Sequence, residues 1–394
     1  MRILHLASEY PPIQVFGLGR AVCDLATAQA AMGEEVHVVT NSIGGKDQDA
    51  EVDGVFVHRI DFPPPPKPPD DTMAVQQFNV SALETAVRVS QRVGAPDVIH
   101  VHDWLTVLAG AEAKWLYPEA RLAVTIHDTA QGKYFGSLTM PQQYMAHLER
   151  WAGMTADCVI CCSRYVGREM VDSYGCPPDK IAIIPCGVDG SRFAVEGDLA
   201  QFRTMFAAPD EQMILYVGRL DPEKGLPVLL DAMAQVIALC PRAKLVIVGK
   251  GQLQEQLQQQ MRSLNLRDRA QFAGYLTGPT LAGAFKCADV MVVPSLYEPF
   301  GIVALEGMVN RVPVVIADSG GLGEIVEDGR TGLKVPPRNP QALAQAITRL
   351  LLDEALRRQI GQAGYEQAVV RYQWADVARQ TVEAYGVGVP VPSQ

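Results

Sequence analysis

Two glutamates, Glu298 and Glu306, follow an apolar run, residues 289–293, that is typical of a buried parallel strand. Pro299 suits the first turn of a helix, because its missing N–H would have no partner there. The spacing predicts Glu298 at a helix entrance and Glu306 about two turns along, roughly 10–12 Å away along the axis at 1.5 Å per residue. That span suits a ligand with a hydroxyl-rich ring at each end and charge between them, as in a nucleotide-sugar.

Two cations, Arg219 and Lys224, follow another apolar run, residues 213–217. They suit a diphosphate, where positive charge stabilises a leaving group as negative charge develops on it. Taken alone, this pair is more often a solvated helix entrance, and Glu298 and Glu306 alone could be solvated helix carboxylates. Together, after adjacent predicted strands, the four residues favour a ligand site.

Short apolar runs alternate with helical patterns along the chain, which predicts parallel sheets with helices on both faces. The predicted strands are residues 2–8, 35–41, 55–60, 98–102, 121–127, 158–162, 181–185, 213–217, 244–248, 271–273, 290–293, 313–317 and 332–335. The pattern restarts near residue 213 after a polar segment, which favours two sheets over one barrel. We expect an α/β protein with two Rossmann-like, doubly wound domains, residues 1–192 and 205–370. A proline-rich stretch, residues 61–69, predicts a rigid surface loop.

Residues that could bind a ligand or take part in catalysis follow the predicted strand ends, where open parallel sheets bind their ligands. They are residues 9–12, 17–19, 102–104, 127–128, 218–220, 223–225, 249–251, 298 and 319–321. This clustering predicts two loop-lined faces across a cleft between the domains.

The composition narrows the function classes. The chain has 394 residues and a net charge of −10, which argues against general nucleic-acid binding. No segment reaches the roughly 18 apolar residues needed to span a bilayer, and the apolar start is too short for a signal peptide. We expect a cytoplasmic protein. The sequence does not exclude a small basic patch that could face anionic lipid.

Two motifs have the spacing of metal-binding sites. Cys158, Cys161 and Cys162 include a C-x-x-C spacing, but they lie in a predicted strand whose alternate residues face opposite sides. We expect reduced, structural thiols there. Asp47 and Asp49 imitate a D-x-D motif, but a Gly-Gly pair precedes them, which predicts a solvated loop.

Taken together, the motifs resemble the retaining glycosyltransferase family with the two-Rossmann GT-B fold. This family contains bacterial and archaeal glycogen synthases, sucrose-phosphate synthases and many α-mannosyltransferases. The resemblance covers almost the whole chain, and its most specific segment is the E-x7-E signature at residues 298–306. Further matching segments are residues 216–219, 223–225, 312–315, 320–326 and 331–337, while residues 9–12 and 102–104 favour the glycogen-synthase-like branch.

The resemblance implies a role for each matching residue. Glu306 would hold the nucleotide ribose, and Glu298 would contact the donor-sugar hydroxyls. Arg219 and Lys224 would bind the diphosphate, and His127 would lie close to the reacting sugar carbon. The implied catalytic set is therefore His127, Arg219, Lys224 and Glu298. Further donor-binding residues would be Gly17, Gly218, Tyr275, Phe300, Gly301, Ile302, Gly320, Gly321 and Leu322, and acceptor-side residues would be Tyr10, Phe16, Asp103 and Trp104.

The resemblance also implies a reaction. A sugar, most simply glucose from ADP-glucose or UDP-glucose, would pass to a glucan acceptor with retention of configuration. The leaving phosphate could accept the acceptor proton, and cationic side chains would stabilise the charge on the diphosphate. No metal and no cofactor other than the donor would therefore be required. The final helix, about residues 371–388, would pack back on the first domain.

Several alternatives stay open. The acceptor could be a hexose phosphate, as in sucrose-phosphate synthases, or a lipid or polysaccharide that receives mannose. A nucleotide-sugar-binding protein with little transfer is motivated by Gln14, Phe16 and Cys186, which replace a lysine, a glycine and an asparagine of the family pattern. A GT-B epimerase is disfavoured by the E-x7-E environment. The base, the acceptor and the oligomeric state are left undetermined.

Overall fold

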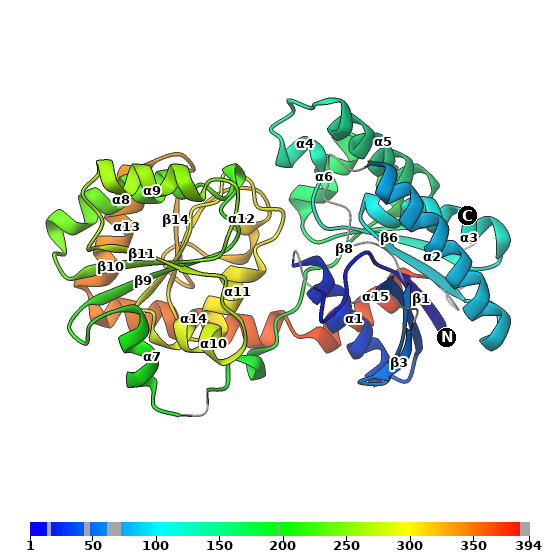
Figure 1. Ribbon diagram of the computed structural model, residues 1–394, viewed down its shortest axis with the longest axis horizontal. Coiled ribbons are helices and arrows are strands. Elements are labelled where there is room, and N and C mark those ends of the chain that lie inside the picture. The colour runs from blue at the N-terminus through cyan, green and yellow to red at the C-terminus, as the bar shows by residue number, and fades with distance from the viewer. Residues whose placement is uncertain (14–16, 43–47, 61–71, 196, 387–394) are drawn as a thin grey trace. The chain divides into compact units, whose positions relative to one another are not determined.

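The computed structural model describes residues 1–13, 17–42, 48–60, 72–195 and 197–386. Gln14, Phe16, Asp47 and the proline-rich stretch lie outside the described residues. The chain divides into two compact units (Figure 1). Unit 1 comprises Met1–Gly187 and Trp374–Gln394, and unit 2 comprises Val188–Gln373.

Unit 1 contains an eight-stranded sheet in the order β3-β4-β2-β1-β5-β6-β7-β8. Its strands are β1 (Arg2–Leu6), β2 (Glu35–Asn41), β3 (Gln48–Val52), β4 (Val55–Ile60), β5 (Val98–His102), β6 (Arg121–Ile126), β7 (Cys158–Cys161) and β8 (Ile181–Ile183). All neighbours are parallel except β3 and β4. The strand order reverses between β1 and β5, so the loops after these two strands diverge at the point where such sheets bind ligands.

Strand β3 corrects the prediction of a solvated loop around Asp49. It pairs with β4 in antiparallel register, and the two are joined at Asp53 and Gly54. Both joining residues have positive φ, 52° and 77°. An Asp-Gly pair is favoured in such a hairpin turn, because each residue tolerates the left-handed region. The signal for this hairpin was therefore present in the sequence.

The helices of unit 1 cover both faces of its sheet. They are α1 (Leu18–Ala31), α2 (Thr72–Val93), η1 (Trp104–Thr106), α3 (Val107–Leu116), α4 (Ala130–Lys133), α5 (Met140–Thr155), α6 (Arg164–Asp172), η2 (Pro178–Lys180) and α15 (Trp374–Ala384). Helix α15 packs on α1 and β7, and its apolar face joins the core built on β1 and β5. Helix α1 begins at Leu18, so Gly19 lies in its first turn. A Cβ on Gly19 would lie 2.8 Å from Cβ of Glu9, which explains the glycine.

Unit 2 contains a six-stranded parallel sheet in the order β11-β10-β9-β12-β13-β14. Its strands are β9 (Gln212–Val217), β10 (Ala243–Val248), β11 (Ala270–Gly274), β12 (Val290–Val293), β13 (Val314–Ala317) and β14 (Leu333–Val335). Its helices are η3 (Gly190–Phe193), α7 (Leu199–Phe206), η4 (Pro222–Lys224), α8 (Leu226–Leu239), α9 (Gln254–Ser263), α10 (Gly278–Cys287), α11 (Ile302–Val309), α12 (Leu322–Ile325), α13 (Pro340–Leu352) and α14 (Glu354–Arg371). The central strands β9 and β12 are almost entirely buried, because helices cover both faces of the sheet. The predicted α/β class with two doubly wound parallel sheets is confirmed.

The chain passes between the units twice, after Gly187 and after Gln373. The N–H of Val188 donates to the carbonyl of Tyr372 (2.8 Å), which pairs the two crossings within unit 2. In unit 1 the ring of Trp374 packs on Gly187, where a Cβ would lie 2.6 Å from the indole. The two crossings therefore run side by side. Among the described residues, no helix combines the length and the apolar character needed to cross a membrane.

Candidate functional site

Lys224 and Glu298 form an ion pair in unit 2. Lys224 lies in η4, after β9, and its ammonium donates to Oε2 of Glu298 (2.8 Å). Glu298 follows the neighbouring strand β12 and is buried, and the hydroxyl of Ser295 donates to the same oxygen (2.9 Å). An ammonium carries three donors, and this is its one hydrogen bond to the described residues. The predicted cation and carboxylate therefore meet, and Lys224 retains donors for a ligand.

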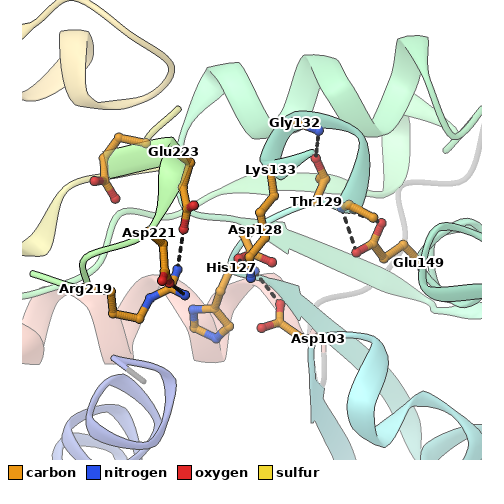
Figure 2. A network of polar contacts seen from close by, with 12 residues as sticks. Asp103, His127, Asp128, Thr129, Gly132, Lys133, Glu149, Arg219, Asp221 and Glu223 are labelled. Atoms are coloured by element: carbon orange, nitrogen blue, oxygen red, sulfur yellow. Dashed lines mark hydrogen bonds and ion pairs between the residues drawn. The ribbon is translucent and has the colours of Figure 1, made fainter. Parts of the chain in front are cut away.

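Arg219 is held by carboxylates of its own loop. Its guanidinium contacts Asp221 and donates to Oε1 of Glu223 (2.7 Å), as Figure 2 shows. Its carbonyl accepts the hydroxyl proton of the buried Tyr216 (2.6 Å). The two cations thus face three carboxylates, Asp221, Glu223 and Glu298. The carboxylates orient the cations, and an anionic ligand would compete with them for the same N–H groups.

The loops after β9 and β12 are joined through their backbones. The N–H of Leu296 donates to the carbonyl of Glu223 (2.7 Å). Gly225 is left-handed with φ 68°, and a Cβ there would lie 2.0 Å from the carbonyl oxygen of Pro294. Only glycine therefore fits between η4 and the next loop.

The loop after β13 is fixed to Glu298 in the same way. The N–H of Gly321 donates to the carbonyl of Glu298 (2.9 Å). Gly320 has φ 58°, and a Cβ there would lie 2.3 Å from the same oxygen. The Gly321 amide thus donates to the protein itself, although the resemblance implied that Gly321 binds the donor. The loops after β9, β12 and β13, three adjacent strands, form one assembly.

Helix α11 begins later than predicted. It starts at Ile302, after Gly301 with φ 112°, so Pro299 precedes the helix and does not lie in its first turn. Glu306 lies in the second turn and is half-buried. The predicted axial separation of Glu298 and Glu306 assumed continuous helix and does not apply. The left-handed conformation of Gly301 is not visible in the sequence pattern, so the start of the helix was predicted too early.

The remaining predicted donor residues differ in position and exposure. Gly218, Gly301, Gly320 and Ile302 lie in the loops or helix starts at the carboxyl edge of the sheet. Tyr275 follows β11 and is 59% exposed. Phe300 and Leu322 are buried, and Phe300 packs edge-to-face on Tyr372 with ring centroids 6.0 Å apart. Their side chains therefore serve packing.

In unit 1, His127 directly follows β6 and is half-buried. Its backbone N–H donates to Oδ1 of Asp103 (2.7 Å), which follows the neighbouring strand β5 (Figure 2). Asp103 has φ 54°, an unfavourable conformation that tends to mark functional loops. Burial, and then the charge of Asp128, raises the pKa of the Asp103 carboxyl well above its usual range. Asp103 thus shapes the loop that carries His127.

Glu149 on α5 is a site residue that the sequence reasoning missed. Both of its carboxylate oxygens accept the N–H of Ala130 (3.0 and 3.1 Å), and burial raises the pKa of Glu149 to about 8. It therefore holds the loop after His127 through the backbone of Ala130. Glu149 is spaced four residues from Met145 and three from Ala152, which places it on the buried, apolar face of α5. This spacing could have predicted a buried carboxylate.

Two predicted acceptor-side residues lie in the core of unit 1. Tyr10 and Trp104 are only 2% and 3% exposed. Gly17 immediately precedes α1, and Phe16 lies outside the described residues. Cys186 is buried, and all eight cysteines are free thiols.

Comparison with known proteins identifies the family. The model described as "Glycosyltransferase Family 4" matches residues 15–192, and the one described as "Glycosyl transferases group 1" matches residues 200–367. An uncharacterised glycosyltransferase of Methanocaldococcus jannaschii is 33% identical, over 99% of both chains. The glycogen synthase of Mycobacterium tuberculosis is 32% identical, over 98% of this chain and 94% of that protein. The structure of sucrose-phosphate synthase from Thermosynechococcus elongatus has a TM-score of 0.83 at 28% identity, over 98% of both chains. The chain therefore belongs to the GT-B glycosyltransferases, with a family 4 domain followed by a group 1 domain.

Proposed function

We propose that this glycosyltransferase transfers glucose from ADP-glucose or UDP-glucose to an α-glucan, with retention of configuration. The observation that carries the proposal is the Lys224–Glu298 ion pair, held by the joined loops of adjacent strands. In this proposal Lys224 would bind the phosphate, and the adjacent buried carboxylate of Glu298 would bind the sugar hydroxyls. The likeness to a glycogen synthase over 98% of the chain supports the choice of donor and acceptor.

The proposed reaction is a displacement at the anomeric carbon. The bond from this carbon to the diphosphate oxygen breaks, and its electron pair stays on the phosphate. Lys224 and Arg219 stabilise that developing charge. The acceptor hydroxyl attacks from the same face and gives its proton to the leaving phosphate oxygen. Glu306 would hold the ribose and Glu298 a sugar hydroxyl, so neither acts as a nucleophile.

His127 would act as a neutral hydrogen-bonding group. Burial lowers the pKa of His127 to about 4, so the imidazole is uncharged at neutral pH. A neutral ring can accept a hydrogen bond from a substrate hydroxyl, whereas a protonated ring could only donate. General acid catalysis by this side chain is therefore disfavoured.

The deciding experiment is a calorimetric titration with ADP-glucose, UDP-glucose and GDP-mannose, followed by mass spectrometry of products formed on a glucan primer. Selective binding of a glucose donor with lengthening of the primer is the expected result, and EDTA should leave the rate unchanged. Selective binding without transfer to a glucan, a hexose phosphate or a lipid would favour a binding protein instead.

A second candidate is transfer to a hexose phosphate. The structural likeness to a sucrose-phosphate synthase, at 28% identity over 98% of both chains, favours it specifically. The two candidates differ in their products, because this reaction gives a phosphorylated disaccharide and the first gives a longer neutral glucan. Offering both acceptors with one labelled donor separates them.

A further inference from the structure

Four histidines of unit 1 lie on or directly after three adjacent strands. His5 is on β1, His100 and His102 are on β5, and His127 follows β6. The first three are fully buried. His5 Nδ1 lies 3.0 Å from His102 Nε2, and His102 Nδ1 lies 3.3 Å from His127 Nε2. A continuous hydrogen-bonded chain therefore runs from the interior of the unit to the candidate catalytic loop.

The inner end of this chain is fixed by Gln29 on α1. Its amide nitrogen donates to the hydroxyl of Tyr385 (2.8 Å), so its carbonyl oxygen is the atom that faces Nε2 of His5 (2.8 Å). A carbonyl only accepts, so His5 must carry its proton on Nε2.

The remaining protons follow from that first one. A neutral imidazole has one N–H and one bare nitrogen, so His5 Nδ1 is bare and accepts from Nε2 of His102. His102 Nδ1 is then bare in turn and accepts from Nε2 of His127. Burial lowers the pKa of His5 and of His127 to about 4, so the rings are neutral at physiological pH. Reversing the Gln29 amide would reverse every bond in the series.

A second branch ties the chain to the last helix. The Tyr385 hydroxyl accepts from Gln29, so its own proton points to Nδ1 of His100 (2.8 Å). Nε2 of His100 then donates to the hydroxyl of Thr125 (2.7 Å). Tyr385 directly follows α15, so this helix helps to hold the Gln29 amide in its orientation.

We propose that Gln29, His5 and His102 are positioning residues that hold His127 in the Nε2–H tautomer. Nδ1 of His127, which has no partner among the described residues, is then the acceptor offered to a substrate hydroxyl. The role of the tautomer in transfer rests on the proposed function, whereas the tautomer itself does not. The wrong tautomer would present a donor where an acceptor is needed.

A buried metal site is the competing interpretation of the same cluster. Potential ligand atoms of His5, His100 and His102 lie within 4.8 Å of one another. Each of their ring nitrogens, however, already has a hydrogen-bond partner, so a metal ion would have to break bonds that the buried rings need.

The test is a long-range ¹H–¹⁵N spectrum of the full chain labelled on histidine, which separates protonated from bare ring nitrogens without any assay of transfer. For the wild type we expect a proton on Nε2 of His127 and a bare Nδ1. In Gln29→Met the hydrogen-bonded series of histidines loses its fixed end, and we expect both tautomers of His127. Gln29→Glu keeps an acceptor toward His5 and should restore the single tautomer.

Activity provides the second readout. We expect Gln29→Met to lower kcat roughly 10-fold with an unchanged KM for the donor, as for other groups that orient a functional histidine, and Gln29→Glu to recover it. Gln367→Met is the control, because Gln367 is a buried glutamine of unit 2 that donates to the carbonyl of Ile325. If Gln29→Met does not fold, Tyr385→Phe should release the amide and give the same mixture.

Three results would overturn the proposal. They are a proton on Nδ1 of His127 in the wild type, an unchanged tautomer in both Gln29→Met and Tyr385→Phe, and stabilisation of unit 1 by added Zn²⁺ with loss of the histidine N–H signals. A wild type that shows the expected tautomer but transfers no sugar would refute only the proposed function.

Discussion

At the scale of single residues, the site of unit 2 depends on charges that hold one another in place. Glu298 is buried, yet it accepts from both Lys224 and Ser295. A buried carboxylate needs such partners, because its desolvation would otherwise cost several kcal/mol. The sequence placed Lys224 and Glu298 in one site. It did not show that they pair, since loops 74 residues apart bring them together.

Lys224→Ala should weaken binding of the nucleotide-sugar about 10- to 100-fold, because a charge-assisted hydrogen bond contributes about 1.5–3 kcal/mol. Calorimetry measures this loss, and far-ultraviolet circular dichroism checks the fold. Lys244→Ala is the control, because Lys244 lies near the start of β10 and donates to the carbonyl of Asp268 (2.9 Å). Equal affinity of the Lys224 variant and the wild type would remove Lys224 from the site.

Glu306→Ala should also weaken nucleotide-sugar binding, by roughly 10-fold or more, because a carboxylate that accepts from ribose hydroxyls forms charge-assisted bonds. The free nucleoside diphosphate should lose affinity to the same extent, since both ligands carry the ribose. Glu255→Ala, an exposed carboxylate at the start of α9, should leave both affinities unchanged. A loss restricted to the sugar-bearing ligand would contradict the ribose assignment.

At the scale of elements, prediction worked where a pattern is local. The apolar run at residues 290–293 became β12 with the predicted ends, and residues 35–41 and 98–102 became β2 and β5. Helix starts were less predictable, because a left-handed glycine such as Gly301 is not visible in a periodic pattern. The chain of histidines was not predicted at all, because its partners lie up to 285 residues apart and only the folded sheet brings them together.

Gly225→Ala should destabilise unit 2, because the position combines left-handed φ with a Cβ only 2.0 Å from a carbonyl oxygen. We expect a loss above about 2 kcal/mol, since backbone strain alone costs roughly 1–3 kcal/mol. Gly329→Ala isolates the strain, because Gly329 also has positive φ, 72°, but nothing lies within 4 Å of the place that a Cβ would take there. Equal losses in chemical denaturation would show that the close approach to Pro294 is unimportant.

At the scale of the whole molecule, the histidines and the tryptophans are unevenly divided between the two units. All seven histidines and all four tryptophans belong to unit 1. Burial lowers the pKa of His5, His100, His102 and His127, so unfolded unit 1 binds more protons than folded unit 1 below pH about 6.5. The stability that these four histidines contribute to unit 1 is therefore fully present above this pH and is lost as the pH falls toward about 4.

We expect acid to unfold unit 1 before unit 2. Each histidine contributes up to about 1.4 kcal/mol per pH unit in this window. Glu149 acts in the opposite direction, because its pKa of about 8 means that stability falls as the pH rises from about 4.5 to 8. Unit 1 should thus be most stable near pH 6.5.

Tryptophan fluorescence follows unit 1 alone, and scanning calorimetry follows both units. Lowering the pH from 6.5 to 4.5 should move the fluorescence transition to lower temperature more than the second calorimetric transition. Coincident transitions at every pH would mean that the two units unfold together.

The double crossing of the chain has a consequence for biosynthesis. Residues 188–373 are an insertion in unit 1, so the ribosome completes unit 2 before it releases α15. Until then the nascent eight-stranded sheet lacks Val377, Ala378 and Tyr385, which fill its core. Its apolar surface and the amide of Gln29 stay open to solvent while nearly half of the chain is still being translated. Unit 1 is synthesised first but is completed last. In that interval, chaperones could bind the apolar surface that α15 later covers.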